Sequence, residues 1–260
     1  MGEATEEMRI GCFITITNPE ERGDTHKECI AMANDLFDEV TIIDGKDTWP
    51  QEFSWPLIGE HFQRGYEQCN ADFVVHLDTD FIFHQKDFGK IRQALRDYPN
   101  APAVSFYKWQ FILPDRYNLK ARLVIAVNKK KFGDRIKFDS GGDLCQPSLD
   151  GKELDLAEVP QAGVPFWNYE KLTKTKEQII DDVERMDDAY LKRFGFTLYS
   201  SDELTAYEGW LQMACGRFNK PSAKIPLEAH PKYIQETIRN LKPEQWGYDG
   251  LGNLERNSYA

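Results

Sequence analysis

Short apolar runs alternate with amphipathic segments along the first hundred residues of the chain. The run at 9–17 is rich in β-branched and aromatic residues, so we expect a strand there, closed by the turn-forming segment NPEERGD. Apolar residues recur at helical spacing over 25–37, and a second apolar run at 39–45 stops at Asp44 and Gly45. Strand, helix and strand in this order predict two parallel strands joined by a crossover helix.

A second helix and a third strand continue this pattern. Ile58, Phe62 and Tyr66 lie four residues apart and predict a helix over 57–69. The run at 73–77 shows too little polar alternation for a half-exposed strand and is typical of a central strand covered on both faces. The first half is therefore predicted as β-α-β-α-β, the start of an α/β protein with a Rossmann-like, mostly parallel sheet flanked by helices.

The second half is expected to add strands and then a helical C-terminal section. Ser200 and Glu203 have the spacing of a capping box, and Pro231 suits the first turn of a helix. Because no repeat or linker interrupts the chain, we expect a single domain over 1–260. The predicted segments are strands at 101–113 and 121–132, a short strand and loop at 134–156, and helices at 168–195, 200–214 and 230–241.

The composition and net charge of the chain indicate a folded protein and bear on whether it binds nucleic acid. Hydrophobic residues make up 41% of the chain and charged residues 29%, which supports a sizeable core and argues against wholesale disorder. The formal net charge of -11 argues against a nucleic-acid partner, because such binding depends on neutralising backbone phosphates.

The cysteines and the N-terminus bear on the compartment. The five cysteines are odd in number, scattered and without a Cys-x-x-Cys pair, so we expect reduced thiols rather than a zinc site or disulfides. The first residues lack the apolar core of a signal peptide, and no apolar run is long enough to span a bilayer. The sequence therefore predicts a cytoplasmic protein without a membrane span.

The segment Asp78-Thr79-Asp80 directly follows the apolar run at 73–77. Ligands of open parallel sheets gather beyond the carboxyl ends of the strands, which is where these two aspartates are expected. Two neighbouring carboxylates repel each other unless a cation compensates them. A divalent ion such as Mn²⁺ or Mg²⁺ suits oxygen ligands and keeps positions open for phosphates. The alternative is a pair of solvated loop aspartates.

In this order the motifs resemble a GT-A glycosyltransferase, closest to the family 2 enzymes. The resemblance covers about 9–83 and implies that the segment FITITNPEERGD, which contains Thr17, holds a nucleotide. It further implies that Asp44 faces the base, that Asp80 binds the metal, and that Asp78 lies near the ribose or the metal. Arg64 could reach a diphosphate with its guanidinium group, or be a solvated helix residue.

The resemblance fades after Phe83 but suggests further roles. The segment NKKKFGDRIKFDSGGDL resembles one that carries the general base, and Asp143 falls nearest that place. The alternative is that Asp143 is a loop residue beside Gly141 and Gly142. Asp139, Glu203 and Glu208 are alternatives for the base. His230 is a candidate third metal ligand, or else a surface residue at a helix start.

Taken together, the resemblance implies a nucleotide-binding half at about 9–100 and an acceptor half with C-terminal helices at about 101–260. The expected reaction is metal-dependent transfer of a sugar from a nucleoside diphosphate sugar to an acceptor hydroxyl, with inversion.

Three other classes of protein share parts of this pattern. A sugar nucleotidyltransferase would carry a Gly-rich basic loop after the first strand, which TITNPEERGD lacks. A haloacid-dehalogenase-type phosphatase would carry Asp-x-Asp on its first strand, followed by Gly-Thr. A non-catalytic sugar- or protein-binding module on the same fold stays open.

Overall fold

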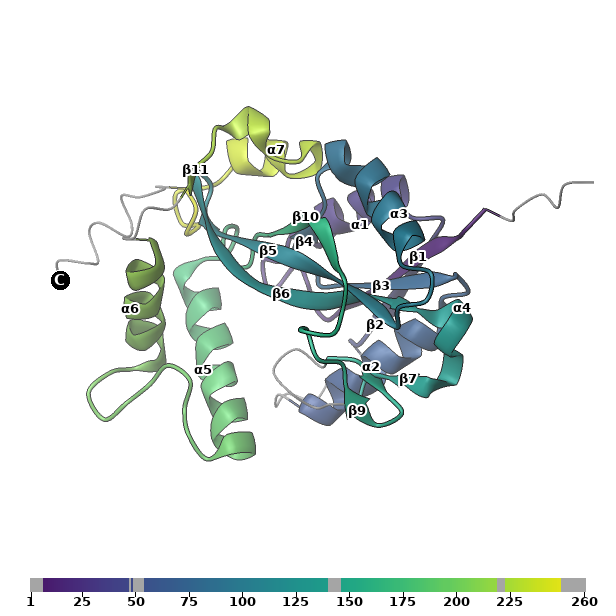
Figure 1. The fold of residues 1–260 in the computed structure, drawn as a ribbon. Coiled ribbons are helices and arrows are strands. Elements are labelled where there is room, and N and C mark those ends of the chain that lie inside the picture. Colours follow the sequence, from purple (N-terminus) through teal and green to yellow (C-terminus); the bar gives the residue numbers. More distant parts are fainter. Residues whose placement is uncertain (1–6, 47, 49–53, 140–145, 219–222, 249–260) are drawn as a thin grey trace, which may run out of the picture.

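A computed structural model describes residues 7–46, 48, 54–139, 146–218 and 223–248 (Figure 1). At its centre lies a curled sheet with the strand order β2-β1-β3-β6-β5-β10-β4, and β11 pairs with β6. A small second sheet has the order β7-β8-β9. The strands are β1 Ile10–Ile16, β2 Glu39–Asp44, β3 Phe73–Leu77, β4 Phe81–Ile82, β5 Ala103–Leu113, β6 Arg116–Asn128, β7 Ile136–Lys137, β8 Ser148–Leu149, β9 Lys152–Glu153, β10 Gln161–Asn168 and β11 Ala223–Lys224.

Most strands of the central sheet point the same way. β2 and β3 flank β1 and pair with it in parallel, and β10 pairs in parallel with β5. β6 lies between β3 and β5 and runs antiparallel to both, so β5 and β10 point in the direction of β3. The predicted α/β architecture with a mostly parallel sheet is confirmed. β6 and the short β4 run antiparallel to their neighbouring strands.

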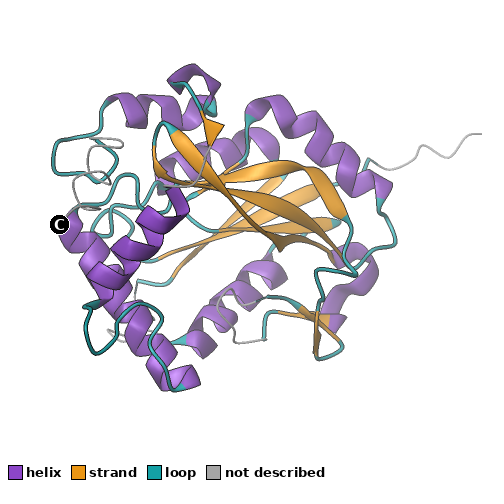
Figure 2. Ribbon diagram, turned by 60° about the vertical axis from the view of Figure 1, so that its left-hand side comes forward, coloured by secondary structure: helices purple, strands orange, loops and turns teal. Residues whose placement is uncertain are grey.

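Helices cover both faces of this sheet (Figure 2). α1, α3 and α7 pack on one face and α2 on the other, whereas α5 and α6 pack together against the end of β5. In the described part of the chain, no helix combines the length and the apolar character that crossing a membrane requires. The helices are α1 His26–Leu36, α2 Trp55–Gln68, α3 Phe88–Asp97, α4 Lys129–Phe132, α5 Lys176–Phe194, α6 Ala206–Phe218 and α7 Lys232–Arg239, with short 3-10 turns at Gln85–Asp87, Gly133–Arg135 and Leu227–Ala229.

Successive side chains of a strand point to opposite faces of the sheet, so alternate residues of β1 pack against different helices. Ile10, Cys12 and Ile14 of β1 belong to the core shared with α1, whereas Phe13 belongs to the core shared with α2. Every residue of β3 is buried, because this strand lies between β1 and β6 and both of its faces are covered. The predicted β-α-β-α-β order of the first half is confirmed.

The prediction of a strand over 121–132 is wrong at its C-terminal end. β6 stops at Asn128, whose side chain accepts a backbone hydrogen bond and begins the short helix α4. The ammonium group of Lys129 fixes this turn to the end of α2 by satisfying carbonyls that the helix leaves unpaired. It donates to the backbone carbonyls of Tyr66, Glu67 and Cys69 at 2.7, 3.0 and 2.8 Å.

The predicted helix over 168–195 begins later than expected, and a strand precedes it. β10 occupies 161–168, a segment whose Gly163 and Pro165 break the apolar pattern, and its register with β5 shifts before Pro165. α5 starts after Thr175, which forms a capping box with Gln178. Its predicted end at Gly195 is confirmed, with the glycine at φ 79° as the C-cap.

The capping box at Ser200 and Glu203 is not formed. Thr205 and Glu208 cap α6 instead: the Glu208 carboxylate accepts from the Thr205 backbone N–H at 2.8 Å, and the Thr205 hydroxyl accepts from the Glu208 N–H at 3.3 Å. The predicted last helix is confirmed, since α7 follows Pro231 and its Ile234 is fully buried.

Candidate functional site

A cavity of about 610 Å³ opens beyond the carboxyl ends of β1 and β3 and is walled by α2, α5 and α6. Its volume lies in the range of about 300–1,000 Å³ that is usual for small-molecule sites. Thr15 and Thr17 line it from β1, and Asp78, Thr79 and Asp80 line it from the turn after β3. The predicted site at the strand ends therefore coincides with a real cavity.

Neighbouring segments hold the turn from Asp78 to Asp80 in place. The Thr25 hydroxyl donates to the Thr79 carbonyl at 3.3 Å, and the backbone N–H of Tyr169 donates to the Asp80 carbonyl at 3.0 Å. The Asp78 carboxylate lies 3.2 Å from Nε2 of His76. Backbone contacts thus fix the turn while both carboxylates face the cavity.

The two carboxylates of the turn have opposite pKa shifts. Burial raises the pKa of Asp80, and the charge of Asp78 raises it further, to about 7. Burial acts in the same direction on Asp78, but His76 and then Lys108 outweigh it and hold the pKa of Asp78 below its usual value. The pair therefore carries negative charge that the described side chains compensate only in part.

A second group of polar side chains reaches the cavity from β5 and β10. Lys108 and Gln110 lie two residues apart on β5, and Asn168 pairs in register with Gln110. Glu170 follows β10, and its carboxylate accepts a hydrogen bond from Nε2 of Gln110 at 2.7 Å. Because side chains two apart on a strand share a face, these residues form one polar surface beside the turn after β3.

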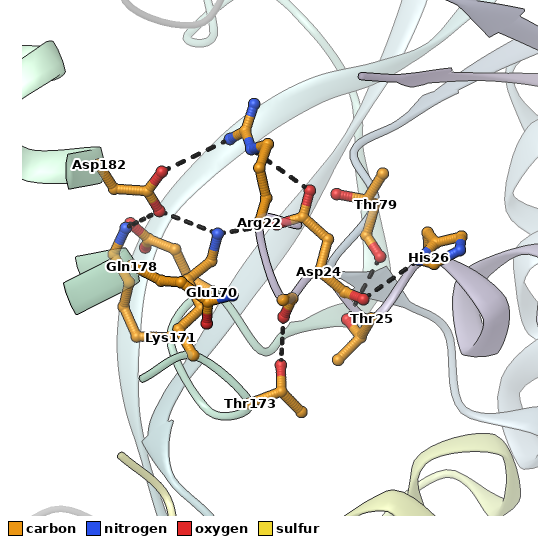
Figure 3. Close-up of polar contacts among 12 residues, drawn as sticks. Arg22, Asp24, Thr25, His26, Thr79, Glu170, Lys171, Thr173, Gln178 and Asp182 are labelled. Carbon is orange, nitrogen blue, oxygen red and sulfur yellow. Dashed lines mark hydrogen bonds and ion pairs between the residues drawn. The ribbon is translucent and has the colours of Figure 1, made fainter. Parts of the chain in front are cut away.

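An ion-pair network joins the loop after β1 to α5 (Figure 3). Asp182 of α5 lies at its centre, 2.9 Å from the ammonium groups of both Lys171 and Lys174. Lys174 also lies 2.8 Å from Asp24, and the Arg22 guanidinium lies 3.6 Å from Asp24 and 3.8 Å from Asp182. All five residues line the cavity, so the network forms one of its walls.

Asp182 is ionised in this network. Burial alone would raise the pKa of Asp182, but the charges of Lys171, Lys174 and Arg22 outweigh burial and hold this pKa well below its usual range. Burial likewise opposes the charge of Lys171, whose pKa is nevertheless raised by Asp182 and Glu170. The wall is therefore a set of mutually compensated charges.

A second buried carboxylate of α5 fixes another segment that lines the cavity. Asp187 of α5 accepts the backbone N–H groups of Leu198, Tyr199 and Ser200 at 2.9, 2.7 and 2.7 Å. Leu198 and Tyr199 line the cavity. Gly209 of α6 packs against this loop so closely that a Cβ there would lie 1.9 Å from the Tyr199 carbonyl oxygen.

The predicted nucleotide-binding residues divide into two groups. Thr17 and Asp78 line the cavity. Asp44 is exposed at the end of β2 and accepts the backbone N–H of Lys46 at 2.9 Å, and Arg64 is exposed on α2. The structure does not bring Asp44 or Arg64 into the cavity.

His230 is fully buried and is not among the residues that line the cavity. Its Nε2 lies 2.7 Å from the Pro114 carbonyl and its Nδ1 lies 2.8 Å from the Tyr169 hydroxyl. Because a carbonyl can only accept, Nε2 is the donor and Nδ1 accepts from the tyrosine. Burial lowers the pKa of His230 to about 4. Both ring nitrogens are engaged, so His230 joins core elements and is not placed to bind a metal with Asp80.

The candidate general bases lie in different places. Asp143 falls outside the described residues. Asp139 is exposed and accepts the Ser148 hydroxyl at 2.5 Å, while Glu203 is exposed and Glu208 caps α6. Glu170, which the sequence reasoning missed, is a carboxylate of the polar surface that β5 and β10 contribute to the cavity. Polar residues inside the apolar segment FYKWQF were a signal for that surface.

The residues around Asp80 fit a divalent cation in part. Asp78 and Asp80 offer carboxylate oxygens in the open cavity, as such an ion requires. Among the described residues, no group of three His, Cys, Asp or Glu side chains is gathered as metal ligands. A cation held here would therefore take its remaining ligands from substrate phosphates, water or amide oxygens.

Comparison with models of known protein families gives no match, and no curated protein matches the chain either.

Proposed function

We propose that this chain is a metal-dependent glycosyltransferase of the GT-A type that transfers a sugar from a nucleoside diphosphate sugar to an acceptor hydroxyl. The observation that carries the proposal is the pair Asp78 and Asp80 at the end of β3, facing a cavity of about 610 Å³. Two adjacent carboxylates with partial compensation favour a bound cation over a stable empty pair.

Asp78 and Asp80 would hold the cation, Mn²⁺ or Mg²⁺, through carboxylate oxygens. When bound, the ion would supply positive charge to the diphosphate that leaves during transfer. Thr15 and Thr17, at the end of the neighbouring β1, line the part of the cavity suited to the nucleotide. The proposed nucleotide site therefore spans β1 and β3, where parallel sheets bind ligands.

Lys108 would supply a second positive charge near the leaving diphosphate. Its charge acts on Asp78, Asp80 and Glu170, yet among the described residues no carboxylate forms an ion pair with it. Its ammonium group lies 5.6 Å from the centre of the Phe81 ring. A lysine held in this way can stabilise negative charge that develops on a departing phosphate.

The general base is proposed to be Asp143, on the strength of the resemblance alone. Glu170 is its competitor inside the cavity. Burial would raise the pKa of Glu170, but Lys171, Lys108 and the hydrogen bond from Gln110 hold this pKa below its usual value. A carboxylate with a lowered pKa is a weaker base, which favours a positioning role for Glu170.

The test is release of nucleoside diphosphate from a panel of uridine, guanosine and thymidine diphosphate sugars, with Mn²⁺ or with chelator. The wild-type protein is expected to turn over one donor only with metal, and Asp80→Asn is expected to be inactive. Asp97→Asn, an exposed carboxylate on α3, is the matched control and should keep wild-type turnover. Metal-dependent binding without turnover of any donor would instead indicate the non-catalytic module.

A further inference from the structure

We propose that the side-chain oxygens of Gln110 and Asn168 form the subsite that receives hydroxyl groups of the transferred sugar. The inference rests on the proposed function, because it assigns part of the same cavity to the sugar of the donor. It concerns two residues that neither the aspartate motif nor the resemblance marks.

The two side chains lie next to each other on the same face of the sheet. Gln110 of β5 and Asn168 of β10 are register partners in a parallel pair, and both line the cavity. Their neighbours in register, Trp109 and Trp167, point to the opposite face and pack in the core. The sheet therefore places the two amide groups side by side in the lining of the cavity.

Both amide oxygens are buried without a hydrogen-bond partner. Gln110 is 5% exposed and Asn168 is 1% exposed. Among the described residues, none donates a hydrogen bond to Oε1 of Gln110 or Oδ1 of Asn168. A buried acceptor without a donor is costly, so its presence in a cavity points to a ligand that supplies the donor.

Glu170 fixes which end of the Gln110 amide is available. Its carboxylate accepts from Nε2 of Gln110 at 2.7 Å, and because a carboxylate accepts only, the amide nitrogen must face it. The carbonyl oxygen of Gln110 is thereby left without a donor. The amide pair therefore offers two unpaired acceptor oxygens, and the Glu170 charge fixes the orientation of the Gln110 amide.

The amide pair lies beside the proposed diphosphate site. Asn168 pairs in the sheet with Phe81, the residue after Asp80. The next residue, Tyr169, donates its N–H to the Asp80 carbonyl at 3.0 Å. A sugar attached to a diphosphate held at Asp78 and Asp80 would therefore reach the two amides.

Hydroxyl groups suit this surface better than other donors. Neutral amide oxygens can each accept a hydroxyl proton from adjacent positions of a sugar ring. A hard cation would prefer carboxylates, and the Glu170 carboxylate is already engaged by Gln110 and lies 3.7 Å from Lys171. A sugar carboxylate offers no donor, so the surface favours a neutral sugar over a uronate.

The test uses near-isosteric variants and two affinities. Asn168→Leu and Gln110→Met remove one amide each, and Gln161→Met is the matched control, because Nε2 of Gln161 is also buried and unpartnered but lies outside the cavity on β10. Calorimetry with Mn²⁺ gives Kd for uridine, guanosine and thymidine diphosphates and for their hexose conjugates. The measured quantity is the ratio of the Kd of the conjugate to the Kd of the parent diphosphate.

We expect that ratio to rise about tenfold in Asn168→Leu and in Gln110→Met, which is the loss of roughly one hydrogen bond. It should stay at the wild-type value in Gln161→Met, and diphosphate affinity should hold in all three. Ligand-free Asn168→Leu should melt at or above the wild-type temperature, because it loses an unpaired buried oxygen.

Unchanged ratios in both folded cavity variants would overturn the subsite while leaving the proposed function standing. An equal rise in the control would also overturn it. If the wild-type protein binds none of the diphosphates with Mn²⁺, the proposed function fails, and the subsite fails with it.

Discussion

Removing the carboxylate at the centre of the ion-pair network should destabilise the protein more than removing an exposed one. Asp182→Asn keeps the size of the side chain but leaves two buried ammonium groups facing an amide. The side chains of Asp182, Lys171 and Lys174 are 10%, 8% and 4% exposed. Breaking a buried pair from one side costs about 3–5 kcal/mol, because the remaining charge stays desolvated.

The expected value lies at the lower end of that range. Lys174 keeps Asp24 at 2.8 Å, and Lys171 keeps Glu170 at 3.7 Å, so neither lysine loses every partner. We therefore expect a loss of about 3 kcal/mol in the free energy of unfolding at pH 7. For a chain of this size that corresponds to a fall of roughly 6–12 °C in Tm.

Thermal and urea unfolding measure this effect, with Asp150→Asn as the control. The Arg135–Asp150 pair is bidentate, at 3.0 and 2.5 Å, but both side chains are more than half exposed, so Tm should stay near that of the wild-type protein. Folding lowers the pKa of Asp182, so the ionised carboxylate contributes its full stabilisation above about pH 4. This stabilisation is lost as the pH falls from about 4 through the pKa of the folded protein. Equal Tm values for Asp182→Asn and Asp150→Asn would refute the reasoning.

Two further predictions concern the general base and His230. Asp143→Asn should lower kcat by about 10²–10⁴-fold with little change in diphosphate affinity. The general base would be a different residue if Asp143→Asn kept a near wild-type kcat while one other variant lost most of its kcat. The variants to compare are Glu170→Gln, Asp139→Asn, Glu203→Gln and Glu208→Gln. His230→Gln should keep metal-dependent nucleotide binding but melt at a lower temperature, and loss of metal binding without loss of stability would contradict its core role. Burial lowers the pKa of His230 to about 4 in the folded protein, whereas the unfolded chain has a pKa of about 6.5 for this residue. The free energy of unfolding of the wild-type protein should therefore be highest above pH 6.5 and should decrease as the pH falls from 6.5 to 4. Urea unfolding at several pH values measures this decrease.

The first half of the fold could be predicted because its signals are local. Short apolar runs, helical spacing and turn residues lie in the right order, and the absence of alternation at 73–77 marked the central strand. β10 could not be predicted in this way. Its Gly163 and Pro165 resemble a loop, and only its pairing with β5 and β4 makes it a strand.

The candidate site shows the same division. Asp78 and Asp80 were found because strand ends are local features of the sequence. Gln110 and Glu170 are 60 residues apart and meet only because β10 returns beside β5. Asp44 and Arg64 lie outside the cavity lining, because Asp44 is exposed at the end of the edge strand β2 and Arg64 is exposed on α2.

Calorimetric titration with nucleoside diphosphate, in Mn²⁺ and again in excess chelator, tests the central claim most directly. The wild-type protein should bind at least one of the uridine, guanosine or thymidine diphosphates, and chelator should abolish most of that affinity. Asp80→Ala should bind weakly in both conditions, so that most of the metal dependence disappears. Equal affinity of the wild-type protein with and without chelator would contradict the account, because the carboxylates at the end of β3 would then serve another purpose.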